Sequence, residues 1–173
     1  MKKRRILLVD GYNVLGARSE MTPGSTLEDA RHALIRRMHN YAGLSGQQVI
    51  LVFDAWQGDR SVRSEDVYSD GFTVVYTRHG ETADNYIERR CDEYARDMEL
   101  GRCEVRVATS DAVEQTVVMG RGAIRISSRE LLYEMETART EGAPFAQSRG
   151  RSTVMDHLPQ DVREKLERMR RKK

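Results

Sequence analysis

The stretch Arg5-Ile-Leu-Leu-Val-Asp-Gly-Tyr-Asn-Val14 decides the fold of this chain. Its apolar part is a short uninterrupted run, which is typical of a parallel strand that is buried on both faces. The run stops at Asp10, and Gly11-Tyr12-Asn13 does not have the pattern of a helix. We therefore expect a buried strand that ends in an acidic side chain which helix capping explains less well than it explains an acid at a helix start.

Strands and helices alternate along the rest of the chain. Apolar runs predict four more strands, at residues 48–54, 72–76, 104–109 and 123–127. Helical periodicity predicts helices from the capping box Ser25–Glu28 to a stop at Gly43, over 82–100, and from the capping box Ser127–Glu130 to about residue 141. This alternation predicts a mostly parallel sheet of about five strands between two layers of helices, a three-layer α/β/α domain. Residues 55–71 are polar, and we expect them to form one long loop.

Length and composition limit the class of protein. The chain has 173 residues, which fits a single domain, and a net charge of only +2. No apolar run approaches the roughly 20 residues that span a bilayer, and the first run is too short for a signal-peptide core. We expect a cytoplasmic protein without a membrane partner. Cys91 and Cys103 do not form a zinc motif, so we expect reduced packing residues.

The end of the chain differs from the rest in composition. Residues 142–153 are rich in Gly, Ser and Arg, so we place the domain at 1–142 and a linker with a basic, helical tail at 143–173. Residues 163–173 hold seven basic and two acidic side chains. Such a cluster could bind a polyanion such as RNA. A solvated helix end, whose dipole favours cations, explains it equally well.

Acidic side chains recur where strands end. Asp10, Asp54 and Asp111 end or directly follow a strand, and Asp84 starts the helix after the third one. The carboxyl ends of parallel strands meet at one edge of a sheet, where ligands bind. Helix capping explains Asp84 or Asp111 separately but not the convergence of four acids.

Four carboxylates at one edge repel one another unless a cation lies among them. Oxygen ligands without histidine suit Mg²⁺ or Mn²⁺, and such ions can activate water against a phosphodiester. Asn13 adds a neutral group that could orient a ligand carboxylate or a water molecule. The pattern therefore favours a divalent-metal site.

The same residues resemble a known family. The stretch from Ile6 to Val14 resembles the opening signature of NYN domains, a branch of the PIN-like nucleases. Val52-Phe-Asp54, Gly80-Glu-Thr-Ala-Asp84 and Ala108-Thr-Ser-Asp111 match the later acidic blocks in order. The likeness covers residues 4–142 and points to the bacterial YacP-like group, which includes a ribosome-associated endonuclease of mRNA decay.

The resemblance implies a role for each residue. Asp10, Asp84 and Asp111 would bind the metal ion, and Asn13 would assist them as a polar neighbour. Asp54 would lie at the rim of the metal site or in its second coordination shell. Glu81 is a further candidate for the site. The implied activity is a Mg²⁺- or Mn²⁺-dependent endoribonuclease that cuts mRNA on the ribosome and leaves a 5′-phosphate and a 3′-hydroxyl.

Other functions remain to be weighed. A non-catalytic RNA- or ribosome-binding protein could use the same scaffold. The intact set of acidic residues argues against it, because a protein without catalytic activity would be free to lose these carboxylates. A haloacid-dehalogenase-like phosphohydrolase would need a second aspartate where Tyr12 stands. A DNA nuclease of the flap type would need helical arches for which the chain has no room.

Several side chains near the predicted edge could contact RNA. Trp56 could stack on a base, or it could simply pack within its loop. Basic side chains could contact phosphates, or they could be solvated loop charges: Arg60, Arg63, Arg78 and His79.

Overall fold

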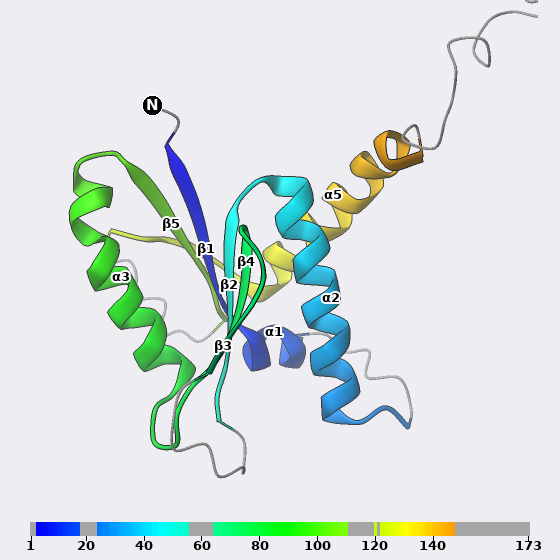
Figure 1. Ribbon diagram of the computed structural model, residues 1–173, viewed down its shortest axis with the longest axis horizontal. Coiled ribbons are helices and arrows are strands. Elements are labelled where there is room, and N and C mark those ends of the chain that lie inside the picture. Colours follow the sequence, from blue (N-terminus) through cyan, green and yellow to red (C-terminus); the bar gives the residue numbers. More distant parts are fainter. Residues whose placement is uncertain (1–2, 18–23, 56–63, 111–119, 121, 148–173) are drawn as a thin grey trace, which may run out of the picture. The chain divides into compact units, whose positions relative to one another are not determined.

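The computed structural model describes residues 3–17, 24–55, 64–110, 120 and 122–147 (Figure 1). These residues contain a six-stranded sheet in the order β3-β4-β2-β1-β5-β6, with only the β3–β4 pair antiparallel. The strands are β1 Arg4–Asp10, β2 Gln48–Phe53, β3 Ser64–Ser69, β4 Phe72–Tyr76, β5 Cys103–Ala108 and β6 Ile124–Ile126. The helices are α1 Gly11–Ala17, α2 Leu27–Ser45, α3 Ala83–Glu99 and α5 Ser128–Gln147.

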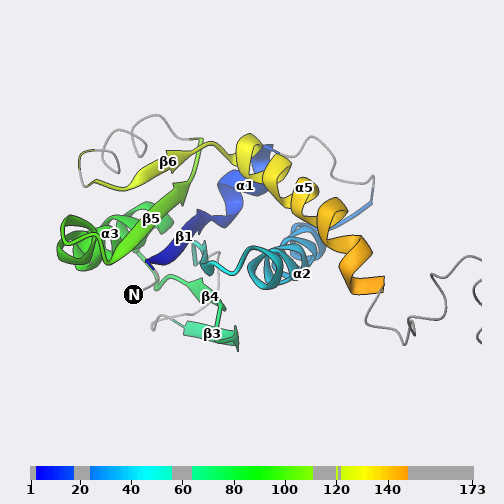
Figure 2. The ribbon, with the colours of Figure 1, turned by 90° about the horizontal axis from the view of Figure 1, so that it is seen from above.

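Helices cover both faces of the sheet, which confirms the predicted α/β architecture. Along β1, Leu7 and Val9 pack with α1, α2 and α5, whereas Ile6 and Leu8 pack with α3 on the other face. All four side chains are fully buried. Figure 2 shows α3 on one side of the strands and α2 and α5 on the other. Burial on both faces is the reason why the strand is continuously apolar.

The strand β3 was not expected. It lies within residues 55–71, which we predicted to be a loop, and it pairs with β4 through the turn at residues 70–71. Its side chains are mostly exposed, and Val67 is 71% exposed. An edge strand held by backbone hydrogen bonds to one neighbour needs no apolar alternation, so the only local sign of it was the hairpin-turn dipeptide Asp70-Gly71.

Some helix ends also differ from expectation. The capping box of α2 joins Thr26 and Asp29 rather than Ser25 and Glu28, and the helix ends at Gly46, whose φ is 62°, rather than at Gly43. The box of α5 is confirmed: the N–H of Ser127 donates to Glu130, and the N–H of Glu130 donates to the Ser127 hydroxyl. The backbone remains helical to Gln147, although the Gly, Ser and Arg content of residues 142–153 had favoured a linker.

The chain divides into two compact units, Met1–Arg139 and Thr140–Lys173, and the described part of the second is the end of α5. The predicted basic tail lies outside the described residues. Among the helices that the structure describes, none has the length and apolar character needed to cross a membrane. Cys91 and Cys103 are buried thiols, as expected.

The strand order places a topological switch at the centre of the sheet. From β1 the chain proceeds to β2 on one side, whereas β5 on the other side of β1 leads to β6. In open α/β sheets the crevice for a ligand forms beyond the carboxyl ends of the strands at such a switch. Asp10 is the last residue of β1, and Ser110 lies two residues after the end of β5, so both lie at this point.

Candidate active site

Asp10 is the last residue of β1, and its side chain is nearly buried, with 9% exposure. Its Oδ1 accepts the backbone N–H of Asn13 at 3.1 Å. Residues 11–17 form α1, so the expectation that no helix follows Asp10 was wrong. The helix is too short for a periodic stripe and forms because Val14 packs into the core. Helix capping is therefore one role of Asp10.

Gly11 explains how Asp10 is fixed against the neighbouring strand. Gly11 is buried, and a Cβ atom there would lie 2.4 Å from Cε1 of Phe53. The ring of Tyr12 meets the same Phe53 ring edge-on, with centroids 5.1 Å apart. Only glycine allows the chain to leave β1 so close to β2. Sequence reasoning missed this residue, although its place directly after the strand was a signal.

Asn13 links the exits of three strands. Its Oδ1 accepts the backbone N–H of Ser110, after β5, at 2.7 Å and the hydroxyl of Ser128, after β6, at 2.7 Å. The backbone N–H of Ser128 also donates to the Ser110 hydroxyl at 3.2 Å. Asn13 therefore acts as a positioning residue for the segment that leads into Asp111. Sequence reasoning did not find Ser110 or Ser128.

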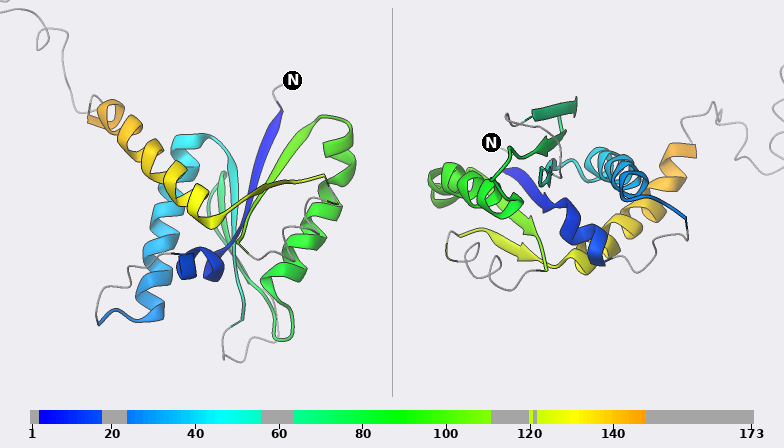
Figure 3. Two further views of the ribbon diagram at one scale, coloured as in Figure 1. Left: turned by 180° about the vertical axis from the view of Figure 1, so that it is seen from behind. Right: turned by 90° about the horizontal axis from the view of Figure 1, so that it is seen from below.

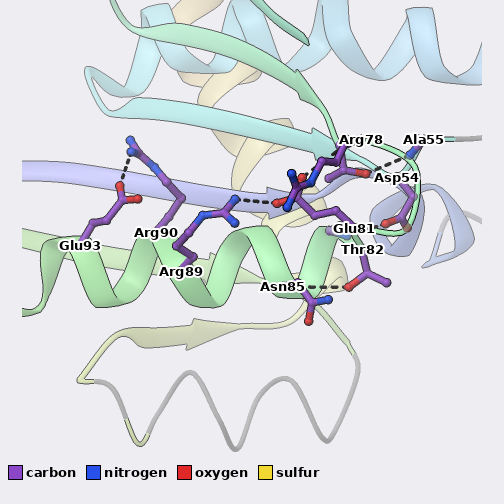
Figure 4. A network of polar contacts seen from close by, with 11 residues as sticks. Asp54, Ala55, Arg78, Glu81, Thr82, Asn85, Arg89, Arg90 and Glu93 are labelled. Atoms are coloured by element: carbon purple, nitrogen blue, oxygen red, sulfur yellow. Dashed lines mark hydrogen bonds and ion pairs between the residues drawn. The ribbon is translucent and has the colours of Figure 1, made fainter. Parts of the chain in front are cut away.

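Asp54 and Asp84 lie at the same edge of the sheet as Asp10, on either side of a contact with the start of α3. Asp54 directly follows β2, and its Oδ1 accepts the backbone N–H of Ala83, the first residue of α3 (Figure 4). Thr77 joins this arrangement, because its hydroxyl accepts the N–H of Ala55 at 3.0 Å. Asp84 lies in the first turn of the helix. The structure thus brings Asp10, Asp54 and Asp84 to the carboxyl edge of the sheet.

Glu81 has a different role from the one considered for it. Its side chain is only 6% exposed, and its Oε1 lies 2.6 Å from Nη2 of Arg89. Its Oε2 accepts the backbone N–H of Arg78 at 3.4 Å (Figure 4). These contacts hold the loop between β4 and α3, so we assign Glu81 to the loop rather than to a metal.

Other predicted residues lie partly outside the described chain. Asp111, Trp56, Arg60 and Arg63 are among the residues that the structure does not describe. Arg78 and His79 are exposed just after β4, at the same edge as Asp10. Within the described ranges, no three acidic, histidine or cysteine side chains form a group that could hold a metal.

The donor chemistry at this edge fits a hard divalent cation. The described acidic side chains offer carboxylate oxygens, and a nearly buried carboxylate such as Asp10 is stabilised by a nearby positive charge. The described part of the site supplies Asp10, with Asp84 on the adjoining helix. Asp111 would follow Ser110, which Asn13 holds in place.

Comparison with known proteins shows the family. The model of the YacP-like NYN domain matches residues 7–171, nearly the whole chain. This protein belongs to the YacP-like NYN domain family. Its sequence is 39% identical over 134 residues to YacP of Bacillus subtilis (strain 168), a match that covers 76% of this chain and 75% of the relative.

Solved structures show the same fold. The crystal structure of a Trp-to-Leu mutant of Rae1 (YacP) from Bacillus subtilis has a TM-score of 0.66 at 32% identity and covers 95% of this chain and 99% of that chain. Another crystal structure of Rae1 (YacP) from Bacillus subtilis has a TM-score of 0.63 at 34% identity, with coverage of 96% and 95%. The NYN domain is PIN-like and nuclease-like, so the resemblance drawn from the sequence is confirmed.

Proposed function

We propose that this NYN domain protein is a divalent-metal-dependent endoribonuclease that cuts mRNA in association with the ribosome, in the cytoplasm. The observation that carries the proposal is the arrangement around Asp10. Its nearly buried carboxylate lies at the switch point of the sheet, and Asn13, three residues later, holds the segment that leads into Asp111.

Asp10, Asp84 and Asp111 would hold Mg²⁺ or Mn²⁺, with Asp54 beside them. A divalent cation supplies Lewis acidity and a nucleophile at neutral pH for phosphodiester hydrolysis. The protein contributes fixed positions. Asp54 accepts an N–H from the start of α3 and so orients the turn that carries Asp84.

Exposed side chains at the same edge support RNA as the substrate. Arg78 and His79 follow β4 and are exposed to solvent. In the proposal these side chains contact phosphates near the cleavage point, and the positive charge of Arg78 brings a polyanion to a cluster of acids that would otherwise repel it.

The test is a cleavage assay on 5′-labelled mRNA with Mg²⁺, Mn²⁺ or EDTA, each with and without ribosomes. We expect cleavage only when metal is present, stronger cleavage with ribosomes, and a 3′-hydroxyl on the labelled upstream product. Asp10→Asn, purified in parallel, controls for contaminating nucleases and should be inactive.

A different outcome would favour the alternative. If the protein binds RNA or ribosomes but leaves every substrate intact with each metal, it is a binding protein on a nuclease scaffold. Cleavage that survives both EDTA and Asp10→Asn would refute the metal-dependent mechanism.

A further inference from the structure

A cavity of about 560 Å³ lies between β6 and the first turns of α5. Its volume falls within the range of small-ligand pockets, roughly 300–1,000 Å³. The strand β6 leads directly into α5 (Figure 3). The cavity starts beside the site described above, because Ser128, which donates to Asn13, directly precedes Arg129 of the lining. The polar lining residues are Arg106, Arg125, Arg129, Glu130, Tyr133 and Glu134.

The two acids of this lining are already engaged. Glu134 accepts hydrogen bonds from both terminal nitrogens of Arg106, at 2.6 and 3.1 Å, and from the hydroxyl of Tyr41 at 3.0 Å. Glu130 accepts the backbone N–H of Ser127 at 2.7 Å within the capping box. Their carboxylates therefore serve internal contacts, and Arg106 is neutralised.

Two arginines and one tyrosine of this lining are exposed to solvent. Arg125 and Arg129 are exposed, and neither forms an ion pair with a carboxylate in the described part of the chain. Tyr133 is 75% exposed and lies one helical turn after Arg129, on the same side of α5. Surfaces that bind single-stranded nucleic acid combine exposed aromatic rings with exposed cationic groups, and Tyr133 lies beside two exposed guanidinium groups.

We propose that Arg125, Arg129 and Tyr133, the β6–α5 pocket, bind an unpaired nucleotide of the RNA strand beside the cleavage point. The identity of the ligand rests on the proposed function. Tyr133 stacks on the base, and the two arginines contact the flanking phosphates. Because a duplex hides the faces of its bases, the pocket selects single-stranded RNA.

The test measures binding without cleavage, in the full-length Asp10→Asn protein. A short fluorescent single-stranded RNA is titrated by anisotropy at several salt concentrations, and a blunt RNA duplex serves as a second ligand. Tyr133→Leu should weaken binding of the single strand by roughly 5- to 150-fold and leave duplex binding unchanged, whereas Tyr133→Phe should retain affinity.

Arg125→Ala/Arg129→Ala should flatten the salt dependence of binding, reducing the slope by about 1.4 for two phosphate contacts. The matched control is Arg96→Ala/Arg102→Ala, which removes two exposed arginines from α3 and from the amino end of β5. It should bind with nearly the affinity and slope of the parent protein.

The proposed role of the pocket would be refuted if Tyr133→Leu bound single-stranded RNA with wild-type affinity. It would also be refuted if the control variant lost as much affinity as Arg125→Ala/Arg129→Ala. The cleavage assay separates this result from a failure of the proposed function. An active nuclease whose pocket variants bind normally would refute only the pocket. A protein that never cuts RNA but binds it through Tyr133 would refute only the nuclease.

Discussion

Gly11→Ala tests whether the contact between α1 and β2 fixes Asp10. The new Cβ would lie 2.4, 2.6 and 2.9 Å from three atoms of the fully buried Phe53 ring. Carbon atoms prefer separations of roughly 3.5–4.0 Å, so the helix or the ring must move by about 1 Å. Overpacking of this kind costs about 1–3 kcal/mol.

An opposing effect is smaller. Alanine is favoured over glycine inside a helix by up to about 1 kcal/mol, and by less at a first helical position. We expect Gly11→Ala to lower the free energy of unfolding by about 1–2 kcal/mol, and the Tm by about 2–8 °C for a chain of this size. Because Asp10 directly precedes Gly11, RNA cleavage should fall as well.

The assay is urea denaturation of four proteins: wild type, Gly11→Ala, Phe53→Leu and the double variant. Leucine lacks two of the three clashing atoms, Cε1 and Cζ, and its side chain is not a rigid ring, so the two substitutions should be coupled by about 1 kcal/mol or more, in the favourable direction. Gly16→Ala is the control, because Gly16 lies in the same helix and, among the described residues, no atom outside its own helix backbone lies within 4 Å of the added Cβ. It should be neutral or stabilising.

The packing argument is wrong if Gly11→Ala is as stable as wild type. It is also wrong if Gly11→Ala lowers the free energy of unfolding by the same amount in the wild-type protein and in Phe53→Leu.

Three further predictions concern charge. Asp10→Asn should abolish cleavage but preserve the Tm, because asparagine can still cap α1 through Asn13, whereas Asp10→Ala should also cost about 1 kcal/mol in thermal melts. The hydrogen bonds from Arg106 lower the pKa of Glu134, so this carboxylate stabilises the fold above the ordinary glutamate pKa, and the effect disappears as the pH falls through the lowered value. Melts from neutral to acidic pH should therefore show Glu134→Gln less stable than wild type near neutrality and equal to it in acid; a constant difference would contradict this. Deletion of 163–173 should weaken RNA binding and flatten its salt dependence, while cleavage at high RNA concentration persists; unchanged affinity and slope would make the tail a solvated helix end.

The sequence by itself determined the layered fold. The apolar run of β1 is local, and its continuity reports burial on both faces. The capping box Ser127–Glu130 also depends only on neighbouring residues, and its position was correct. The alternation of such segments implies parallel strands, whose carboxyl ends must share an edge. For this reason the placement of Asp10, Asp54 and Asp84 at one edge could be predicted.

The tertiary structure alone decided contacts between distant residues. The helix α1 forms because Val14 enters the core, and β3 forms because β4 offers an edge. Asn13 holds Ser110 and Ser128, which lie 97 and 115 residues later in the chain. Local pattern cannot reveal such partners, because strand order and register determine which residues meet. The same reason hid the β6–α5 pocket, where an edge strand and a helix bring two exposed arginines and an exposed tyrosine together.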